Sequence, residues 1–236
     1  MWGDRVRRFF AGRIESDTFL GLDLTVSLLV AGGGSWLFGA LLDAVLDNAT
    51  MVRLDRAAAA WVHAHATARC LAVFQRISEL GSPISMTVLC VIGAGLLLHY
   101  RRTPMLITWI AAFAGSGILG RVVKAAVRRG RPTYGIDYLT GASYSFPSGH
   151  AAGSLIGIAM TVFVIRTYGL LDTAWLVVLS LVGAVFVLLV GMSRVYLGVH
   201  YPSDVIGGYA VSAAWGAICI VVAGVVLHRR GRTLSS

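Results

Sequence analysis

Six long apolar segments constrain this chain more than any other feature of its sequence. A helix that crosses a bilayer needs about 20 mainly apolar residues, with roughly 17–25 tolerated. The six segments that meet or approach this length cover residues 19–46, 83–99, 104–123, 150–165, 174–197 and 205–227. They lack the alternation of lipid-facing and lumen-facing residues that barrel strands show, and such strands need only about 9–11 residues. We therefore predict an all-α, polytopic membrane protein with six transmembrane helices, forming one domain over residues 1–236.

Composition agrees with this class. The chain is 57% hydrophobic and 13% charged, whereas soluble domains carry roughly 25% charged residues, and a soluble protein of this size has too little interior for so much apolar surface. The net charge of +9 is also found in nucleic-acid-binding proteins. Here, however, the basic residues flank apolar segments, as membrane loops and headgroup contacts require. We expect membrane lipids, and no nucleic acid, as partners.

The stretch from residue 51 to residue 81, between the first two apolar segments, differs from its neighbours. Charged side chains such as Arg53, Asp55 and Arg76 are interspersed with apolar ones such as Leu54 and Trp61 at helical spacing. This pattern is typical of amphipathic helices that lie on a bilayer surface. We predict one or two interfacial helices here, with an ordinary connecting loop as the alternative.

The basic residues also predict the orientation of the chain. Residues 1–13 are basic and lead into the first apolar segment without a small-residue cleavage site, so we expect an uncleaved first span. Basic residues favour the cytoplasmic side. With cytoplasmic termini that side holds ten arginines, against seven basic residues opposite once Lys124, Arg131 and Arg194 are set aside. We predict a multi-pass protein of a bacterial cytoplasmic membrane with cytoplasmic termini.

Three polar motifs lie at the ends of the apolar segments. The first begins at Lys124, the only lysine of the chain, and follows the third span. The second opens the fourth span, and the third joins the fifth span to the sixth. Their residues are Lys124, Arg131 and Pro132; Pro147, Ser148, Gly149 and His150; and Ser193, Arg194, His200 and Asp204. Because successive spans cross in opposite directions, all three motifs meet at one face, which is extracytoplasmic in the predicted orientation.

Several of these residues have the chemistry that a phosphate group requires. Arg131 and Arg194 offer planar forks that match phosphate oxygens, and Lys124 offers a compact point charge. Ser148 and Gly149 directly precede an apolar helix, whose positive end is where an anion binds best. Glycine also lets the backbone approach an anion closely. We predict that these five residues bind phosphate.

The two histidines suit catalysis. His200 is followed four residues later by Asp204, and a carboxylate that holds one ring nitrogen leaves the other free to attack. The spacing predicts a turn that runs into a helix, with Pro202 at its start and Ser203 as its cap. His150, at the start of the fourth span, is placed to give a proton to a leaving oxygen. Activity should then have a bell-shaped pH dependence, with His200 neutral and His150 protonated.

Each residue taken alone has an ordinary explanation. Arginine or lysine at a span end is usually a headgroup anchor, interfacial histidine is usually structural, and Ser-Gly before a helix is usually a cap. Eleven fixed identities in three motifs are far harder to explain by ordinary residue usage. Arg128 and Arg129 keep both interpretations open, because they could hold a second phosphate or simply anchor the chain at headgroups.

Together the motifs resemble the signature of the type-2 phosphatidic acid phosphatase superfamily, K-x6-R-P, P-S-G-H and S-R-x5-H-x3-D, at every fixed position. The resemblance covers most of residues 19–227. It implies that His200 is the nucleophile that forms a phosphohistidine, that Asp204 orients His200 and that His150 protonates the leaving group. It also implies that Lys124, Arg131, Ser148, Gly149 and Arg194 cradle the phosphoryl oxygens, and that no metal or other cofactor is needed.

The expected function is therefore metal-independent hydrolysis of a membrane lipid phosphate. A polyprenyl diphosphate such as undecaprenyl diphosphate is the favoured substrate, and phosphatidate or phosphatidylglycerophosphate is the alternative. A non-catalytic lipid transporter or scaffold is disfavoured because both His150 and His200 are present. A vanadate-dependent peroxidase would share the phosphate-like cradle, but six membrane spans argue against it.

Overall fold

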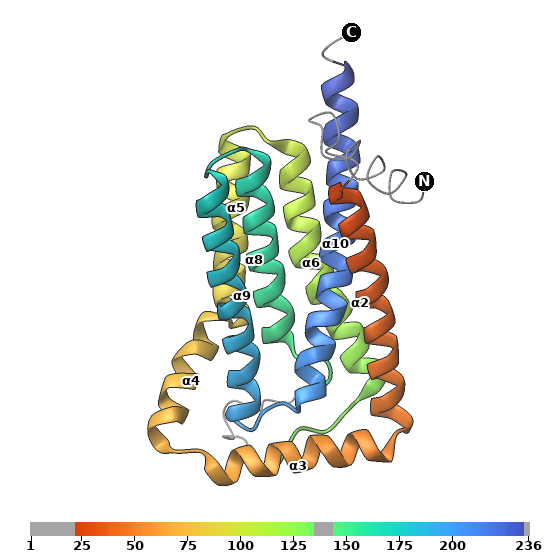
Figure 1. Cartoon of the computed structure of the whole chain (residues 1–236), viewed down its shortest axis with the longest axis vertical. Coiled ribbons are helices and arrows are strands. Elements are labelled where there is room, and N and C mark those ends of the chain that lie inside the picture. Colours follow the sequence, from red (N-terminus) through yellow and green to blue (C-terminus); the bar gives the residue numbers. More distant parts are fainter. Residues whose placement is uncertain (1–21, 135–143, 234–236) are drawn as a thin grey trace, which may run out of the picture.

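The computed structural model describes residues 22–134 and 144–233. These residues form helices and connecting turns, and no strand occurs among them (Figure 1). The helices are α2 (Leu22–Asp47), α3 (Ala49–His65), α4 (Ala68–Leu80), α5 (Pro83–His99), α6 (Thr103–Val127), α8 (Gly149–Thr167), α9 (Thr173–Tyr196) and α10 (Pro202–Thr233). The expected N-terminal basic segment and the start of the first span at residue 19 lie outside the described residues.

Six helical stretches are long and apolar enough to cross a membrane, which confirms the predicted number. All six pass at least one predicted limit, and the extensions of α6 and α10 affect the polar motifs. Helix α6 continues to Val127, so Lys124 lies inside the helix and not in a loop after it. Helix α10 begins at Pro202, so Asp204 belongs to its first turn. The sequence underestimated both helices because their polar ends do not count toward an apolar window.

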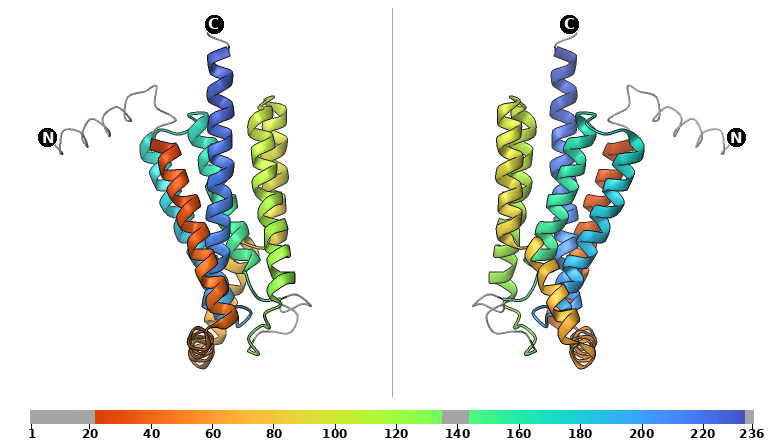
Figure 2. Two further views of the ribbon diagram at one scale, coloured as in Figure 1. Left: turned by 90° about the vertical axis from the view of Figure 1, so that its right-hand side faces the viewer. Right: turned by 90° about the vertical axis from the view of Figure 1, so that its left-hand side faces the viewer.

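Two helices, α3 and α4, form the segment in which the sequence predicts one or two interfacial helices. Asn48 starts α3, because its side chain accepts hydrogen bonds from the backbone N–H groups of Thr50 (2.9 Å) and Met51 (3.2 Å). Helix α3 lies across the ends of the bundle helices, and two further views show it beneath them from either side (Figure 2). Helix α4 runs obliquely from α3 towards the bundle and packs against α9. Helices α3 and α4 together form the predicted amphipathic segment, with α3 across the helix ends and α4 inclined against α9.

The apolar core lies between α5, α6, α8 and α10. Its best-buried large side chains are Met105, Trp109, Ile156 and Met160, each at most 3% exposed. The Trp109 indole N–H donates to the carbonyl of Cys90 at 2.9 Å, so the core satisfies the polar end of its largest member. This packing fixes α6, α8 and α10 against one another, and these are the helices whose ends carry Lys124, His150 and Asp204.

A glycine turn joins α9 to α10. Gly198 has φ of 67°, a left-handed conformation that a side chain disfavours, and it directly follows the cap of α9. The backbone N–H groups of Val199 and His200 then donate to the carbonyl of Arg194, at 3.1 and 3.2 Å. The turn thereby fixes His200 beside the last turn of α9.

Candidate active site

Four helix ends carry the predicted site residues, and they meet at the end of the bundle that α3 crosses. They are the C-terminal ends of α6 and α9 and the N-terminal ends of α8 and α10 (Figure 1). Both the start of α2 and the end of α10 lie at the opposite end. The structure brings the three motifs together as span parity predicts, and the residues that meet are Lys124, Arg131, Ser148, Gly149, His150, Arg194, His200 and Asp204.

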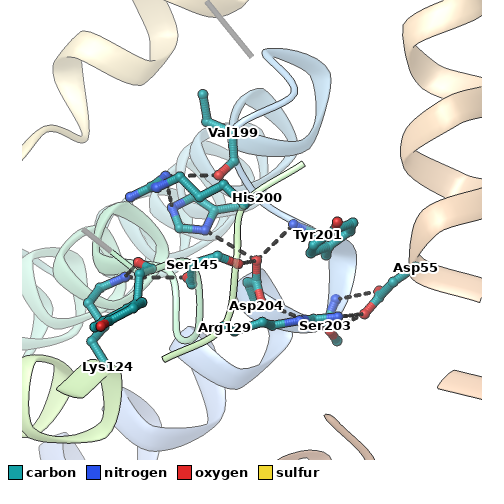
Figure 3. Close-up of polar contacts among 11 residues, drawn as sticks. Asp55, Lys124, Arg129, Ser145, Val199, His200, Tyr201, Ser203 and Asp204 are labelled. Atoms are coloured by element: carbon teal, nitrogen blue, oxygen red, sulfur yellow. Dashed lines mark hydrogen bonds and ion pairs between the residues drawn. The ribbon is translucent and has the colours of Figure 1, made fainter. Parts of the chain in front are cut away.

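The His200 ring lies between a carboxylate and a guanidinium. Its Nδ1 is 3.3 Å from Asp204 Oδ2 (Figure 3). Its Nε2 is 3.4 Å from Arg131 Nη1. A carboxylate only accepts and a guanidinium only donates, so Nδ1 carries the ring hydrogen and Nε2 keeps its lone pair. His200 is 2% exposed. Burial lowers the pKa of His200 to about 4, against the opposing hydrogen bond and charge of Asp204, so the ring is neutral at physiological pH.

Asp204 is held through both carboxylate oxygens. Besides His200, Oδ2 accepts the Ser145 hydroxyl and, at 2.8 Å, the backbone N–H of Tyr201. Oδ1 accepts Arg129 Nη1 at 2.6 Å. The bond from Tyr201 is the one that an acidic side chain in a first helical turn makes to the capping residue. Asp204 therefore caps α10 in place of Ser203, which corrects the predicted cap, while Pro202 opens the helix as expected.

Arg129 does not lie in the predicted phosphate site. Its Nη1 also donates to Ser203 Oγ (2.7 Å), its Nη2 donates to Asp55 Oδ2 (2.7 Å), and its guanidinium stacks over the Tyr201 ring at 4.4 Å. Both terminal nitrogens are thus bound to acidic or hydroxyl groups. These contacts disfavour the second-phosphate role that was left open for Arg129. Nothing in the sequence indicates that Asp55 lies opposite. Arg128 is exposed and ends α6, with its Nε donating to the carbonyl of Ala125.

Three cations surround the space next to His200. Arg131 Nη1 donates to the carbonyl of Val199 at 2.8 Å. Lys124 Nζ donates to the carbonyls of Tyr144 (2.6 Å) and Ser145 (3.3 Å). Arg194, 4% exposed, donates through Nη1 to the Ser78 hydroxyl of α4. Backbone carbonyls therefore orient Lys124 and Arg131, and the Ser78 hydroxyl orients Arg194.

Two buried polar atoms at this site have no hydrogen-bond partner, and they are the only such side-chain atoms within residues 22–134 and 144–233. They are Ser148 Oγ and Arg194 Nε. A buried donor without a partner is costly, and a bound phosphate oxygen would satisfy both. The Ser148 backbone N–H, by contrast, already donates to the carbonyl of Asp204 at 2.8 Å. The expected Ser148 contribution thus moves from its amide to its hydroxyl, which the sequence did not distinguish.

Gly149 and His150 form the first turn of α8. A Cβ built at Gly149 would meet no atom within 4 Å, so the backbone there borders open space. The half-buried His150 has four charged or ionisable neighbours near enough to act on it electrostatically, namely Lys124, Arg131, Arg194 and His200. His150 therefore lies beside the three cations and His200, where the sequence predicts a proton donor.

Sequence reasoning missed four residues that support the site: Asp55, Ser78, Arg129 in its observed role, and Ser145. Asp55 and Ala59 form the buried face of α3, and no sequence signal distinguishes Asp55 from the other charged residues of this helix. Ser145 directly precedes a segment that packs closely on α10 at its glycines 207 and 208. A Cβ at Gly207 would meet the Phe146 ring at 2.6 Å, and one at Gly208 would meet the Ser148 carbonyl at 2.6 Å.

No group of three or more His, Cys, Asp or Glu side chains suited to a metal occurs in the part of the chain that the structure describes. The donors that converge beside His200 are cations and a hydroxyl. Such groups bind an anion and not a metal ion.

Comparison with known proteins identifies the family. A model of the PAP2 superfamily matches residues 105–226. Phosphatidylglycerophosphatase B of Bacillus subtilis is 33% identical over 141 residues, which is 59% of this chain and 68% of the relative. Decaprenylphosphoryl-5-phosphoribose phosphatase of Mycobacterium tuberculosis is 34% identical over 158 residues, covering 65% of this chain and 81% of its own. Undecaprenyl-diphosphatase of Sulfolobus acidocaldarius is 36% identical over 125 residues, covering 50% and 55%.

A solved structure agrees with the arrangement of the helices. The crystal structure of a transmembrane PAP2-type phosphatidylglycerolphosphate phosphatase from Bacillus subtilis matches with a TM-score of 0.73 and 26% identity. The match covers 81% of this chain and 94% of that one. The named relatives are phosphatases, which confirms the predicted enzyme class of a hydrolase acting on phosphoric ester or diphosphate bonds. The chain belongs to the PAP2 superfamily.

Proposed function

We propose that this protein hydrolyses the phosphate of a membrane lipid through a phosphohistidine formed on His200. One observation carries the proposal. The neutral, buried ring of His200 is held by Asp204 through Nδ1. Its Nε2 carries no hydrogen, so its lone pair is directed towards Arg131. Beside it, Ser148 Oγ and Arg194 Nε await partners that phosphate oxygens would supply. An activated nucleophile thus lies next to two donors, one from Ser148 and one from Arg194, that could bind an anion.

The chemistry would proceed in two steps. In the first, the Nε2 lone pair attacks phosphorus and the bond to the lipid oxygen breaks. His150, which takes up a proton once the bound phosphate offsets the charges of the cations around it, gives that proton to the lipid oxygen. In the second, water attacks the phosphorus of phosphohistidine, its proton goes to His150, and inorganic phosphate leaves His200 with its lone pair restored. The Nδ1 hydrogen stays on the Asp204 side throughout.

The cationic cradle would stabilise the phosphoryl group in both steps. Phosphoryl transfer depends mainly on positioning and on neutralising charge over the equatorial oxygens. Lys124, Arg131 and Arg194 supply three positive charges, and the start of α8 adds its dipole. On this basis we propose that the reaction needs no metal ion, as the family resemblance implies.

We propose a lipid phosphate monoester as the preferred substrate. The three cations form one cradle, and Arg129, which a second phosphate would need, is bound to Asp55 and Asp204. A polyprenyl diphosphate, favoured from the sequence, is the second candidate. It is supported by the undecaprenyl-diphosphatase relative and by the exposed Arg128.

We further propose that the protein lies in a bacterial cytoplasmic membrane with cytoplasmic termini, so that the site faces the extracytoplasmic side. Two observations support this orientation. Arginines are more numerous on the side of the termini once the motif residues are set aside, and α10 ends at the opposite end of the bundle from His200.

The test is phosphate release by detergent-purified protein in the presence of EDTA. Phosphatidylglycerophosphate and undecaprenyl diphosphate would be compared as substrates. We expect release from both, faster from the monoester, and none from His200→Ala. His99→Ala, which removes an exposed histidine at the other end of the bundle, is the matched control and should retain activity.

A second readout tests the intermediate. Acid-labile, base-stable radiolabelled phosphate should be trapped on the wild-type protein and be absent from His200→Ala. Release that requires added Mg²⁺, or that survives in His200→Ala, would refute the proposed mechanism.

A further inference from the structure

An acidic side chain of α3 is buried at the active site although it lies far from the motifs in sequence. Asp55 is 2% exposed. Its Oδ1 accepts the backbone N–H of Ser203 at 3.1 Å, and its Oδ2 accepts the Ser203 hydroxyl and Arg129 Nη2, the latter at 2.7 Å. Buried carboxylates are rare unless they are paired, and Asp55 has a specific partner for each oxygen.

Arg129 connects this carboxylate to the one that holds His200. Its guanidinium is divided between them, with Nη2 on Asp55 and Nη1 on Asp204, at 2.7 and 2.6 Å (Figure 3). The arginine side chain is 11% exposed, and the Tyr201 ring covers one face of its guanidinium. The contacts thus run without interruption from Asp55 through Arg129 and Asp204 to His200.

This arrangement affects both the geometry and the charge of Asp204. Arg129 fixes Oδ1, which directs Oδ2 at His200 Nδ1. An arginine paired with Asp204 alone would also neutralise the carboxylate, and it would then stabilise a positive imidazole poorly. Asp55 balances that arginine, so the negative charge of Asp204 stays available as charge develops on His200. Such effects are strong in a buried site because the effective dielectric constant is low.

We propose that Asp55 is a positioning residue for the phosphatase reaction, acting on His200 through Arg129 and Asp204. The interfacial helix α3 is accordingly part of the active site and not only a connection between two spans. The inference rests on the proposed function and extends it to a residue outside the three motifs.

The alternative is that Asp55 only anchors α3 to the bundle. The two roles predict different measurements, because Asp55 is not among the groups that face a bound phosphate. The charged or titratable groups around His200 are Asp204, Arg131, Arg194 and His150. A positioning role therefore slows the chemistry and leaves anion binding intact, whereas an anchoring role changes the yield of folded protein.

The experiment compares Asp55→Asn with wild-type protein, using phosphatidylglycerophosphate as substrate and inorganic phosphate as competitive inhibitor. An asparagine must place its NH2 against either Ser203 N–H or Arg129, so one contact is lost and the charge is removed. We expect kcat/KM per monodisperse protein to fall about 10–100-fold, as for other carboxylates that orient a reactive group indirectly. The inhibition constant of inorganic phosphate should not change.

Asp47→Asn is the matched control, since it makes the same chemical change at an exposed site at the end of α2, next to α3. It should match the wild type in both measurements. An Asp55→Asn protein with wild-type kcat/KM would overturn the inference, and so would a parallel loss of phosphate binding. Inactive wild-type protein would instead count against the proposed function, so the two failures are distinguishable.

A double-mutant cycle keeps the inference testable if Asp55→Asn folds poorly. Arg129→Gln combined with Asp55→Asn removes one charge of each sign, and so leaves fewer unpaired buried charges than Arg129→Gln alone. If Asp55 acts through Arg129, the double variant should be no slower than Arg129→Gln. Independent, multiplicative losses from the two substitutions would show that Asp55 acts by another route.

Discussion

The apolar core and the polar cluster around Asp204 are equally well buried, but they are held in opposite ways. In the core, Met105 and Met160 are fully buried and depend on close packing with many neighbours. In the cluster, Asp204 is also fully buried, yet each of its oxygens is fixed by named donors. Packing energy is spread over many weak contacts, whereas a buried polar network depends on every member. The effect of a substitution should therefore depend on whether the residue belongs to the hydrogen-bond network or to the apolar core, and not on how deeply it is buried.

The largest effect is expected from Asp204→Asn. An amide in place of the carboxylate turns an NH2 group towards one of the donors that now bind Asp204, so the orientation of His200 is lost. By analogy with a triad carboxylate, kcat should fall about 10⁴-fold. The measurement is single-turnover phosphate release. Asp172→Asn is the control, because asparagine caps α9 as well as aspartate does, and a comparable loss there would mean that the assay reports folding.

Arg194→Lys should have the next largest effect. Lysine keeps the charge but has no fork, so it cannot bind Ser78 and a phosphate oxygen together. We expect kcat/KM to fall about 10²–10³-fold, as when one oxyanion donor is removed. Arg76→Lys, at an exposed pair with Glu79, provides the comparison. Equal activity of the two variants would contradict the assigned role of Arg194.

The pH dependence tests the cluster without substitution. Burial favours neutral His200 and lowers its pKa to about 4, and the neutral form is the nucleophile. As pH falls, the loss of kcat/KM caused by protonation of His200 should not appear above about pH 5.5. Below that, kcat/KM should decline through about pH 4, approaching a tenfold loss per pH unit. An acid limb near 6.5, the value of an exposed histidine, would show that the nucleophile is not buried as described.

The smallest effect is expected in the core. Met160→Leu conserves volume and removes no hydrogen bond, so it should cost less than about 1.5 kcal/mol. Activity should equal that of the wild type, with only a small shift in the melting temperature of the purified protein. A loss of activity similar to that of Arg194→Lys would remove the contrast between the two regions.

The sequence was sufficient for those features that depend on local pattern. Hydropathy located the six spans, and motif spacing together with span parity located Lys124, His150, Arg194 and His200 at one face. The packing of α4 against α9 could not be predicted, because amphipathic character does not determine direction. Ser78 of α4 faces Arg194, a contact between residues 116 positions apart.

The supporting residues could not be predicted because their identities are ordinary and their contacts are distant. Asp55 resembles any acidic residue of an amphipathic helix until it is placed against Ser203, 148 positions later in the chain. For the same reason Arg129 was left between a second-phosphate ligand and a headgroup anchor, since only the fold shows two carboxylates beside it. A single sequence gives no information on such pairings.

The location of Asp204 on α10 has a consequence for biosynthesis. The carboxylate that orients His200 is contributed by the last transmembrane helix, while Asp55, Arg129 and Ser145 come from segments synthesised earlier. A nascent chain with five inserted helices already carries Lys124, His150 and Arg194, but it has no oriented nucleophile. If Asp204 has the proposed role, activity requires the insertion of α10, and phosphate release can serve as a sensitive assay of the membrane integration of this helix.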